Sequence, residues 1–133
     1  MSKINAAIIG YGNIGRYVLD ALEAADDFTV AGIVRRQDIP IPGVDYPVVT
    51  NIDQLDNVDV AILCVPSRQI KAYAVDFLKK GINTVDSFDT HAKIPEYFAS
   101  VDEVAKENGT LSIISVGWDP GLFSINRVMG EAV

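Results

Sequence analysis

Short apolar runs alternate with longer amphipathic stretches along this chain of 133 residues. The first run, residues 4–10, is almost wholly apolar, which is typical of a central parallel strand buried on both faces. Five further apolar runs predict strands, the second of them short: 28–34, 47–50, 58–65, 82–87 and 110–116. The stretches between these runs are longer and need a different interpretation.

Apolar residues recur at helical spacing in the longer stretches. Three helices are predicted on this basis: 68–80, 95–107 and 13–25, the last with Ile14, Val18, Ala21, Leu22 and Ala25 as its apolar residues. Gly81 and Gly109 follow two of them and favour helix ends there. A last helix is predicted from Ser124 onward, whereas the three prolines and one glycine of 39–47 predict a loop.

Strands that alternate with helices predict βαβ units and an α/β fold with a Rossmann-like, doubly wound parallel sheet. Right-handed crossovers in such a sheet place ligands at the C-terminal ends of the strands. Five loops follow predicted strands and are expected to gather along one edge: 10–15, 34–38, 64–68, 86–91 and 115–121.

The first of these loops, Gly10-Tyr-Gly12-Asn13-Ile14-Gly15, fits the G-x-G-x-x-G pattern. It follows a predicted buried strand and opens a predicted helix, and this context favours a dinucleotide site over a plain tight turn. The glycines allow the turn, the approach of a pyrophosphate and close packing of helix on strand, while the helix N-terminus supplies amide donors. Five residues of this loop, all but Tyr11, are predicted to belong to the cofactor-binding site.

The second loop carries Arg35 and Arg36 where NAD-binding domains usually place an acidic residue. A carboxylate would repel a 2′-phosphate, whereas a guanidinium can bind it with two hydrogen bonds. We therefore predict NADP(H) as the cofactor, with both arginines as phosphate ligands. The alternative is a pair of solvated surface arginines.

The third loop contains Cys64, Pro66 and Ser67. Pro66 fits the start of a helix, and Ser67 is expected to cap that helix or to contact the cofactor. Cys64 is interpreted as a small buried residue beside the cofactor rather than a nucleophile, because no histidine partner is evident.

Composition excludes several classes of protein. A formal net charge of −7 argues against binding to nucleic acid or to an anionic membrane. One cysteine excludes an internal disulfide and agrees with a cytoplasmic location. No apolar run approaches the roughly 18 residues that a membrane span requires, and one histidine with one cysteine is a poor metal-ligand set.

Five segments together are specific: GYGNIGR (10–16), VRR (34–36), LCVPSR (63–68), NTVDSFDTH (83–91) and SVGWDPGLFSINR (115–127). In this order and spacing the chain resembles the N-terminal domain of the meso-diaminopimelate dehydrogenases. The resemblance implies an NADP-dependent amino-acid dehydrogenase that deaminates meso-2,6-diaminopimelate at its D-centre, giving L-2-amino-6-oxopimelate (tetrahydrodipicolinate). It also implies a homodimer and a place in lysine biosynthesis.

The resemblance further implies the substrate contacts. Trp118 would form an apolar wall, Asp119 would offer a carboxylate to a substrate ammonium, and Gly121 would help to fix the turn. Asp89 would meet the same amino group, so both aspartates are the candidate catalytic residues. An Asx-type cap at Asp89 and an ordinary turn at Asp119 are the alternatives, and His91 ranks below the aspartates as a general base.

Family members are about twice as long as this chain. We therefore expect an NADP-binding domain over 1–121, with 122–133 beginning the connection to a substrate and dimerisation domain that this chain lacks. Such a chain is expected to bind cofactor without turnover, and to expose an apolar face near 122–133. The alternatives are another two-domain NADP oxidoreductase, such as dihydrodipicolinate reductase or a sugar dehydrogenase-like protein, and a non-catalytic NADP sensor.

Overall fold

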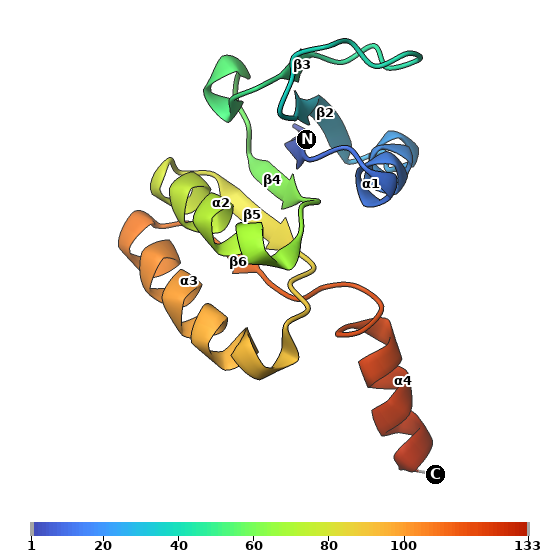
Figure 1. Ribbon diagram of the computed structural model, residues 1–133, viewed down its shortest axis with the longest axis vertical. Coiled ribbons are helices and arrows are strands. Elements are labelled where there is room, and N and C mark those ends of the chain that lie inside the picture. The colour runs from blue at the N-terminus through green and yellow to red at the C-terminus, as the bar shows by residue number, and fades with distance from the viewer. Residues whose placement is uncertain (1, 133) are drawn as a thin grey trace. The chain divides into compact units, whose positions relative to one another are not determined.

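A computed structural model describes residues 2–132 (Figure 1). The chain divides into two compact units, residues 1–65 and 66–133. Met1 and Val133, the outer ends of the predicted segments 1–121 and 122–133, lie outside the described residues. Each unit is described by itself.

The first unit is a set of parallel strands hydrogen-bonded in the order β3-β2-β1-β4. Its elements are β1 (Ile4–Ile9), α1 (Asn13–Ala24), β2 (Phe28–Val34), β3 (Val48–Val49), the short 3-10 helix η1 (Ile52–Gln54) and β4 (Val60–Leu63). Residues 6–9 of β1 are buried between β2 and β4. The predicted central strand is thus confirmed.

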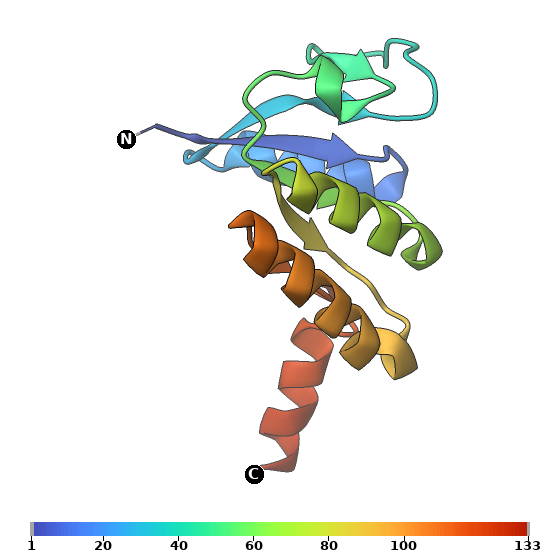
Figure 2. The same ribbon diagram turned by 90° about the vertical axis from the view of Figure 1, so that its left-hand side faces the viewer.

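Helix α1 lies alongside β1 and β2, as Figure 2 shows. It buries Gly15, Leu19 and Leu22 against the strands. Ile14, which the apolar spacing placed with the packed residues, is 59% exposed. The helix turns the face centred on Leu19 to the core, and Ile14 remains in the solvent-facing first turn.

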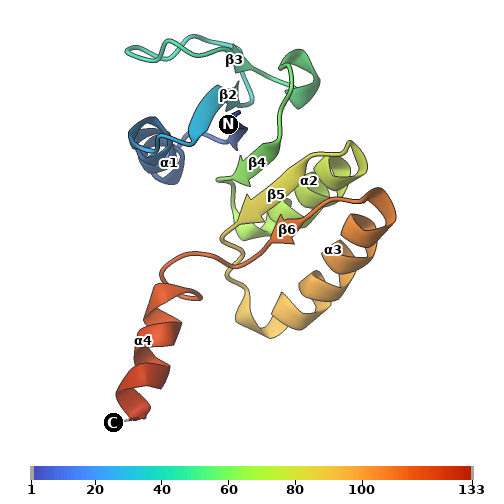
Figure 3. The ribbon, with the colours of Figure 1, turned by 180° about the vertical axis from the view of Figure 1, so that it is seen from behind.

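The second unit contains the parallel pair β5 (Asn83–Asp86) and β6 (Ser112–Ile113). Its helices are α2 (Ser67–Lys79), the 3-10 helix η2 (His91–Lys93), α3 (Ile94–Asn108) and α4 (Leu122–Glu131). Helices α2 and α3 pack against each other, and each contacts its neighbouring strand (Figure 3). The core of this unit includes Ile70, Phe77, Leu78 and Tyr97.

Strand β6 is shorter than the predicted run 110–116. On one side of the strand, Thr110 N–H donates to the Ala105 carbonyl of α3 at 3.0 Å. On the other side, Ser115 has φ 57° and interrupts the extended backbone, although Val116 N–H still donates to the Asp86 carbonyl of β5 at 2.9 Å. Gly109 ends α3 with φ 62°, as predicted. The 3-10 helices were not predicted, because periodicity does not detect elements of three residues.

Helix α4 projects away from α2 and α3 in all three views (Figures 1–3). Leu122, Ile125, Val128 and Met129 are each more than half exposed, so the expected apolar face is present. Among residues 2–132, no helix combines the length and apolar character needed to cross a bilayer.

Truncation of a buried side chain in the second unit tests this core. Leu78 is 0% exposed, so Leu78→Ala is expected to lower the free energy of unfolding by about 2–5 kcal/mol. Leu111→Ala is the matched control, because Leu111 is 62% exposed and its loss should change little. Urea unfolding of both variants measures the difference, and equal losses would contradict the assigned packing.

Candidate functional site

The glycine loop after β1 is a tight turn in which neighbouring main-chain atoms leave no room for a Cβ at two positions. Gly10 has φ 91°, and a Cβ there would lie 2.5 Å from the Cys64 carbonyl oxygen. A Cβ at Gly15 would lie 2.5 Å from the Gly10 carbonyl oxygen, which is how closely α1 packs on the loop. These positions therefore require glycine for the reasons that the motif predicts.

The start of α1 is open to a ligand. Its N-cap is Gly12, which makes no side-chain capping bond and has nothing within 4 Å of a built Cβ. Asn13 and Ile14 are exposed beside it. Uncapped amides at a helix N-terminus suit a pyrophosphate, so this part of the chain fits the predicted cofactor.

Arg35 and Arg36 follow the end of β2 directly. The Arg35 main-chain N–H donates to the Val49 carbonyl at 2.9 Å, which fixes the backbone beside β3. Arg35 is half-buried and Arg36 exposed, and neither guanidinium forms an ion pair with another described residue. Both charges therefore remain free to bind an anion.

Cys64 lies at the end of β4 and is half-buried. Burial raises the pKa of its thiol from an ordinary value of 9.0 to about 11. Little thiolate exists at neutral pH, which agrees with its interpretation as a packing residue and not a nucleophile.

The structure brings Ser67 and Asp89 together within the second unit. The Ser67 hydroxyl donates to Asp89 Oδ1 at 2.6 Å, and the Asp89 main-chain N–H donates to Ser67 Oγ at 3.2 Å. The helix cap predicted as one option for Ser67 is wrong, because Pro66 is the N-cap of α2 and no side chain caps it. The serine hydroxyl bonds to the aspartate instead.

The loop after β6 carries Trp118, Asp119 and Gly121. Gly121 has φ 140°, and its tight approach to Gly117 accompanies a bond from Leu122 N–H to the Gly117 carbonyl at 2.9 Å. The Trp118 ring packs on Phe123 with centroids 5.3 Å apart, yet remains 61% exposed. The turn thus presents a largely open indole beside Asp119.

His91 and Asp119 approach each other, with His91 Nε2 3.8 Å from Asp119 Oδ1. This contact links the loop after β5 to the loop after β6. Among the described residues, Asp89 bonds to Ser67 and Asp119 pairs with His91, and no hydrogen bond joins the two aspartates. No cluster of three potential metal ligands occurs in the described part of the chain.

Sequence reasoning missed the buried pair Asp86 and Tyr97. Asp86 is 2% exposed and accepts a short hydrogen bond from the Tyr97 hydroxyl. Burial, together with this bond, raises the pKa of Tyr97 well above its ordinary value. The available signal was one carboxylate at the end of the otherwise uncharged run 82–87, because a charge there needs partners.

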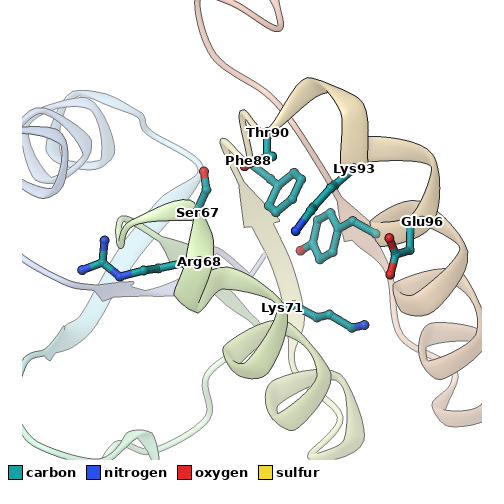
Figure 4. A pocket seen from close by; sticks show the side chains of 8 residues that line it. Ser67, Arg68, Lys71, Phe88, Thr90, Lys93 and Glu96 are labelled. Carbon is teal, nitrogen blue, oxygen red and sulfur yellow. The ribbon is translucent and has the colours of Figure 1, made fainter.

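A pocket of about 290 Å³ opens beside this pair (Figure 4). It is lined by Ser67, Arg68, Lys71, Phe88, Thr90, Lys93, Glu96 and Tyr97. Ser67 alone among these is a predicted site residue, and Arg68 points away from Phe88 and Lys93. Asp89, Trp118 and Asp119 do not line this pocket, so it is distinct from the predicted substrate contacts.

Residues 4–88 match the family described as "Oxidoreductase family, NAD-binding Rossmann fold". The chain belongs to this oxidoreductase family. The predicted Rossmann-like α/β class is thereby confirmed, and parallel pairing of every described strand agrees with it.

The individual proteins to which this chain is similar have more specific names than the family does. Meso-diaminopimelate D-dehydrogenase of Bacteroides fragilis is 55% identical over 136 residues, covering 100% of this chain and 46% of that enzyme. The Corynebacterium glutamicum diaminopimelate dehydrogenase, solved in complex with DAP, is 36% identical with a TM-score of 0.84, covering 99% of this chain and 42% of that one. The resemblance drawn from the sequence is confirmed.

An engineered D-amino acid dehydrogenase bound to NADP+ is similar to the same degree. Its TM-score is 0.84 at 35% identity, and the match covers 98% of this chain and 41% of that one. The chain therefore spans less than half the length of these three relatives. None of the three is a dihydrodipicolinate reductase, a sugar dehydrogenase or a sensor, so those alternatives are not favoured.

Alkylation of the single cysteine tests the burial of Cys64. At pH 8, iodoacetamide should react about tenfold or more slowly with the native chain than with the urea-unfolded chain, since the lower thiolate fraction outweighs the higher nucleophilicity. Below pH 9 the protonated thiol makes its full contribution to the free energy of unfolding, and this contribution is lost as the pH rises toward about 11. Equal alkylation rates in the two states would contradict the assignment.

Proposed function

We propose that this chain is the cofactor-binding part of an NADP-dependent meso-2,6-diaminopimelate dehydrogenase. The reaction is oxidative deamination at the D-centre, which yields L-2-amino-6-oxopimelate and ammonia. The observation that carries the proposal is the match over 100% of the chain, at 55% identity, to a meso-diaminopimelate D-dehydrogenase. That match includes both the glycine loop and the Trp118–Asp119 loop.

The proposed cofactor contacts in the first unit begin with the glycine loop. The uncapped start of α1, with Gly10, Gly12, Asn13, Ile14 and Gly15, would receive the pyrophosphate. Arg35 and Arg36 would hold the 2′-phosphate that distinguishes NADP from NAD, because their guanidinium groups lack ion-pair partners among the described residues. Cys64, Pro66 and Ser67 would border the cofactor from the loop after β4.

The substrate contacts belong to the second unit. Asp89 and Asp119 would hold the ammonium group of the D-centre, while Trp118 and the turn at Gly121 would form the wall beside it. Asp119 is 42% exposed and Asp89 is also exposed, so each carboxylate is open to a ligand. A carboxylate pair also suits proton removal from the ammonium, which must become a neutral amine before oxidation.

Bound NADP+ supplies the hydride acceptor for this reaction. The residues of this chain orient the amine and move its proton. The Ser67 hydroxyl donates to Asp89 at 2.6 Å and orients that carboxylate. His91, 3.8 Å from Asp119, is a basic neighbour that could accept a proton from it. We rank His91 below the two aspartates as the group that removes the ammonium proton.

The wider organisation is proposed on the same basis. A cofactor domain over 1–121 would be followed by a connecting segment over 122–133, where α4 begins. The exposed apolar side chains of α4 support burial of that helix in the assembled enzyme. From the family resemblance of the sequence we also propose a cytoplasmic homodimer in lysine biosynthesis, with turnover requiring a chain as long as the relatives'.

Calorimetric titration of the 133-residue chain tests the cofactor assignment. NADPH should bind about tenfold or more tightly than NADH, a difference of ~1.4 kcal/mol. The double variant Arg35→Ala/Arg36→Ala should lose that preference while it keeps its affinity for NADH. Arg127→Ala, which removes a guanidinium packed on Phe123, should leave the preference unchanged.

Turnover is tested with residues 1–133 in place of the matching segment of the Bacteroides fragilis relative. NADPH formation from meso-diaminopimelate is the expected activity. Asp119→Asn should lower kcat by about a hundredfold or more, as for loss of a group that moves a proton. Asp26→Asn, at an exposed site outside the proposed contacts, is the control; equal activity in the two variants would remove Asp119 from the site.

A further inference from the structure

Asp86 is a buried carboxylate at the last residue of β5, and it stands outside both proposed contact sets. Only 2% of its surface is exposed. It precedes Asp89 by three residues, at the start of the loop that carries the proposed amine ligand. A carboxylate removed from water in this way must be satisfied by donors.

Those donors come from three separate segments. Oδ1 accepts the main-chain N–H of Phe88 at 2.9 Å and that of Ser115 at 3.0 Å. Oδ2 accepts the hydroxyl of Tyr97, from the first turns of α3. The Asp86 carbonyl also accepts the Val116 N–H at 2.9 Å. One residue therefore binds the loop after β5, the loop after β6 and helix α3.

Asp86 bonds to the loop after β6 at a residue whose backbone conformation is unfavourable. Ser115 has φ 57°, a conformation that side chains other than glycine rarely adopt. Its hydroxyl is buried without a partner among the described residues, so the main-chain bonds to Asp86 are what hold it. Trp118 and Asp119 follow within four residues, and their direction depends on this turn.

The loop after β5 is fixed by the same group. Phe88 stacks on Tyr97 with ring centroids 4.5 Å apart and is itself buried. The bond from Phe88 N–H to Asp86 and the ring stack together hold the residue immediately before Asp89. The Ser67 bonds then complete the placement of the Asp89 carboxylate.

We infer that Asp86, with Tyr97, is a positioning residue that sets the directions of Asp89 and Asp119 from one buried carboxylate. The roles of those two aspartates rest on the proposed function, whereas the geometry of Asp86 does not. An asparagine at position 86 keeps one acceptor oxygen for the two amides, but it carries no charge and turns an NH2 donor toward the Tyr97 hydroxyl, so it weakens the bonds that the carboxylate makes. Asp86→Asn is therefore the informative variant, and Tyr97→Phe removes one donor alone.

The single tryptophan, Trp118, reports the position of the loop after β6 without a label. Time-resolved fluorescence anisotropy of the 133-residue chain should show greater nanosecond motion of Trp118 in Asp86→Asn, and a smaller change in the same direction in Tyr97→Phe. Amide exchange at Ser115 should become about tenfold faster or more in Asp86→Asn, as expected when a hydrogen bond to a charged group is replaced by a weaker one to a neutral amide.

Thr84→Val is the matched control. Thr84 is 1% exposed and donates to Ser112 Oγ at 2.9 Å, so this variant also breaks a buried bond between β5 and β6. It should lower the melting temperature without changing Trp118 anisotropy. Parent-like anisotropy in Asp86→Asn, or an equal change in Thr84→Val, would overturn the inference; if Asp86→Asn does not fold, the comparison of Tyr97→Phe with Thr84→Val decides.

NADPH titration of the same variants separates the two proposals. Asp86→Asn should keep the parent's NADPH affinity within about twofold, because Asp86 lies outside the proposed cofactor contacts. If the parent chain binds no NADPH, the proposed function fails. The anisotropy comparison still decides the role of Asp86 in that case.

Discussion

The second unit is organised around the hydrogen bonds that one buried carboxylate, Asp86, requires. Asp86 cannot remain charged inside the protein without donors, and its donors are the backbone of two loops and a tyrosine of α3. The order of the two loops is thus coupled to the packing of α3 through Tyr97. The same requirement explains how Ser115 keeps a left-handed backbone conformation in a loop that carries an exposed tryptophan.

A different constraint organises the first unit. Gly10 and Gly15 are required because the main chain of the loop approaches Cys64 and α1 too closely for a Cβ. That steric requirement and the absence of a side-chain cap leave the amides at the start of α1 open. Packing of helix against loop and the capacity to bind a phosphate group therefore have the same physical origin.

Burial and steric limits also explain why much of the fold could be predicted from the sequence. Apolar periodicity located every strand and the long helices, and the glycine spacing located the first loop. Periodicity failed at Ile14, which is exposed, and at β6, where Thr110 bonds to α3 and Ser115 interrupts the extended backbone. Asp86 was missed because its partners lie up to 30 residues away, at Val116, and no local pattern records bonds over that separation.

Charge placement explains how an acidic chain can serve an anionic cofactor. A net charge of −7 creates an unfavourable field for a dinucleotide phosphate, so recognition must depend on short-range donors. Arg35, Arg36 and the start of α1 would supply such donors in the first unit. The second unit instead offers Asp89 and Asp119, which suit a cationic amine and disfavour an anion. Local groups of opposite sign would thus let cofactor and substrate each find its own contacts, although the overall field favours only the amine.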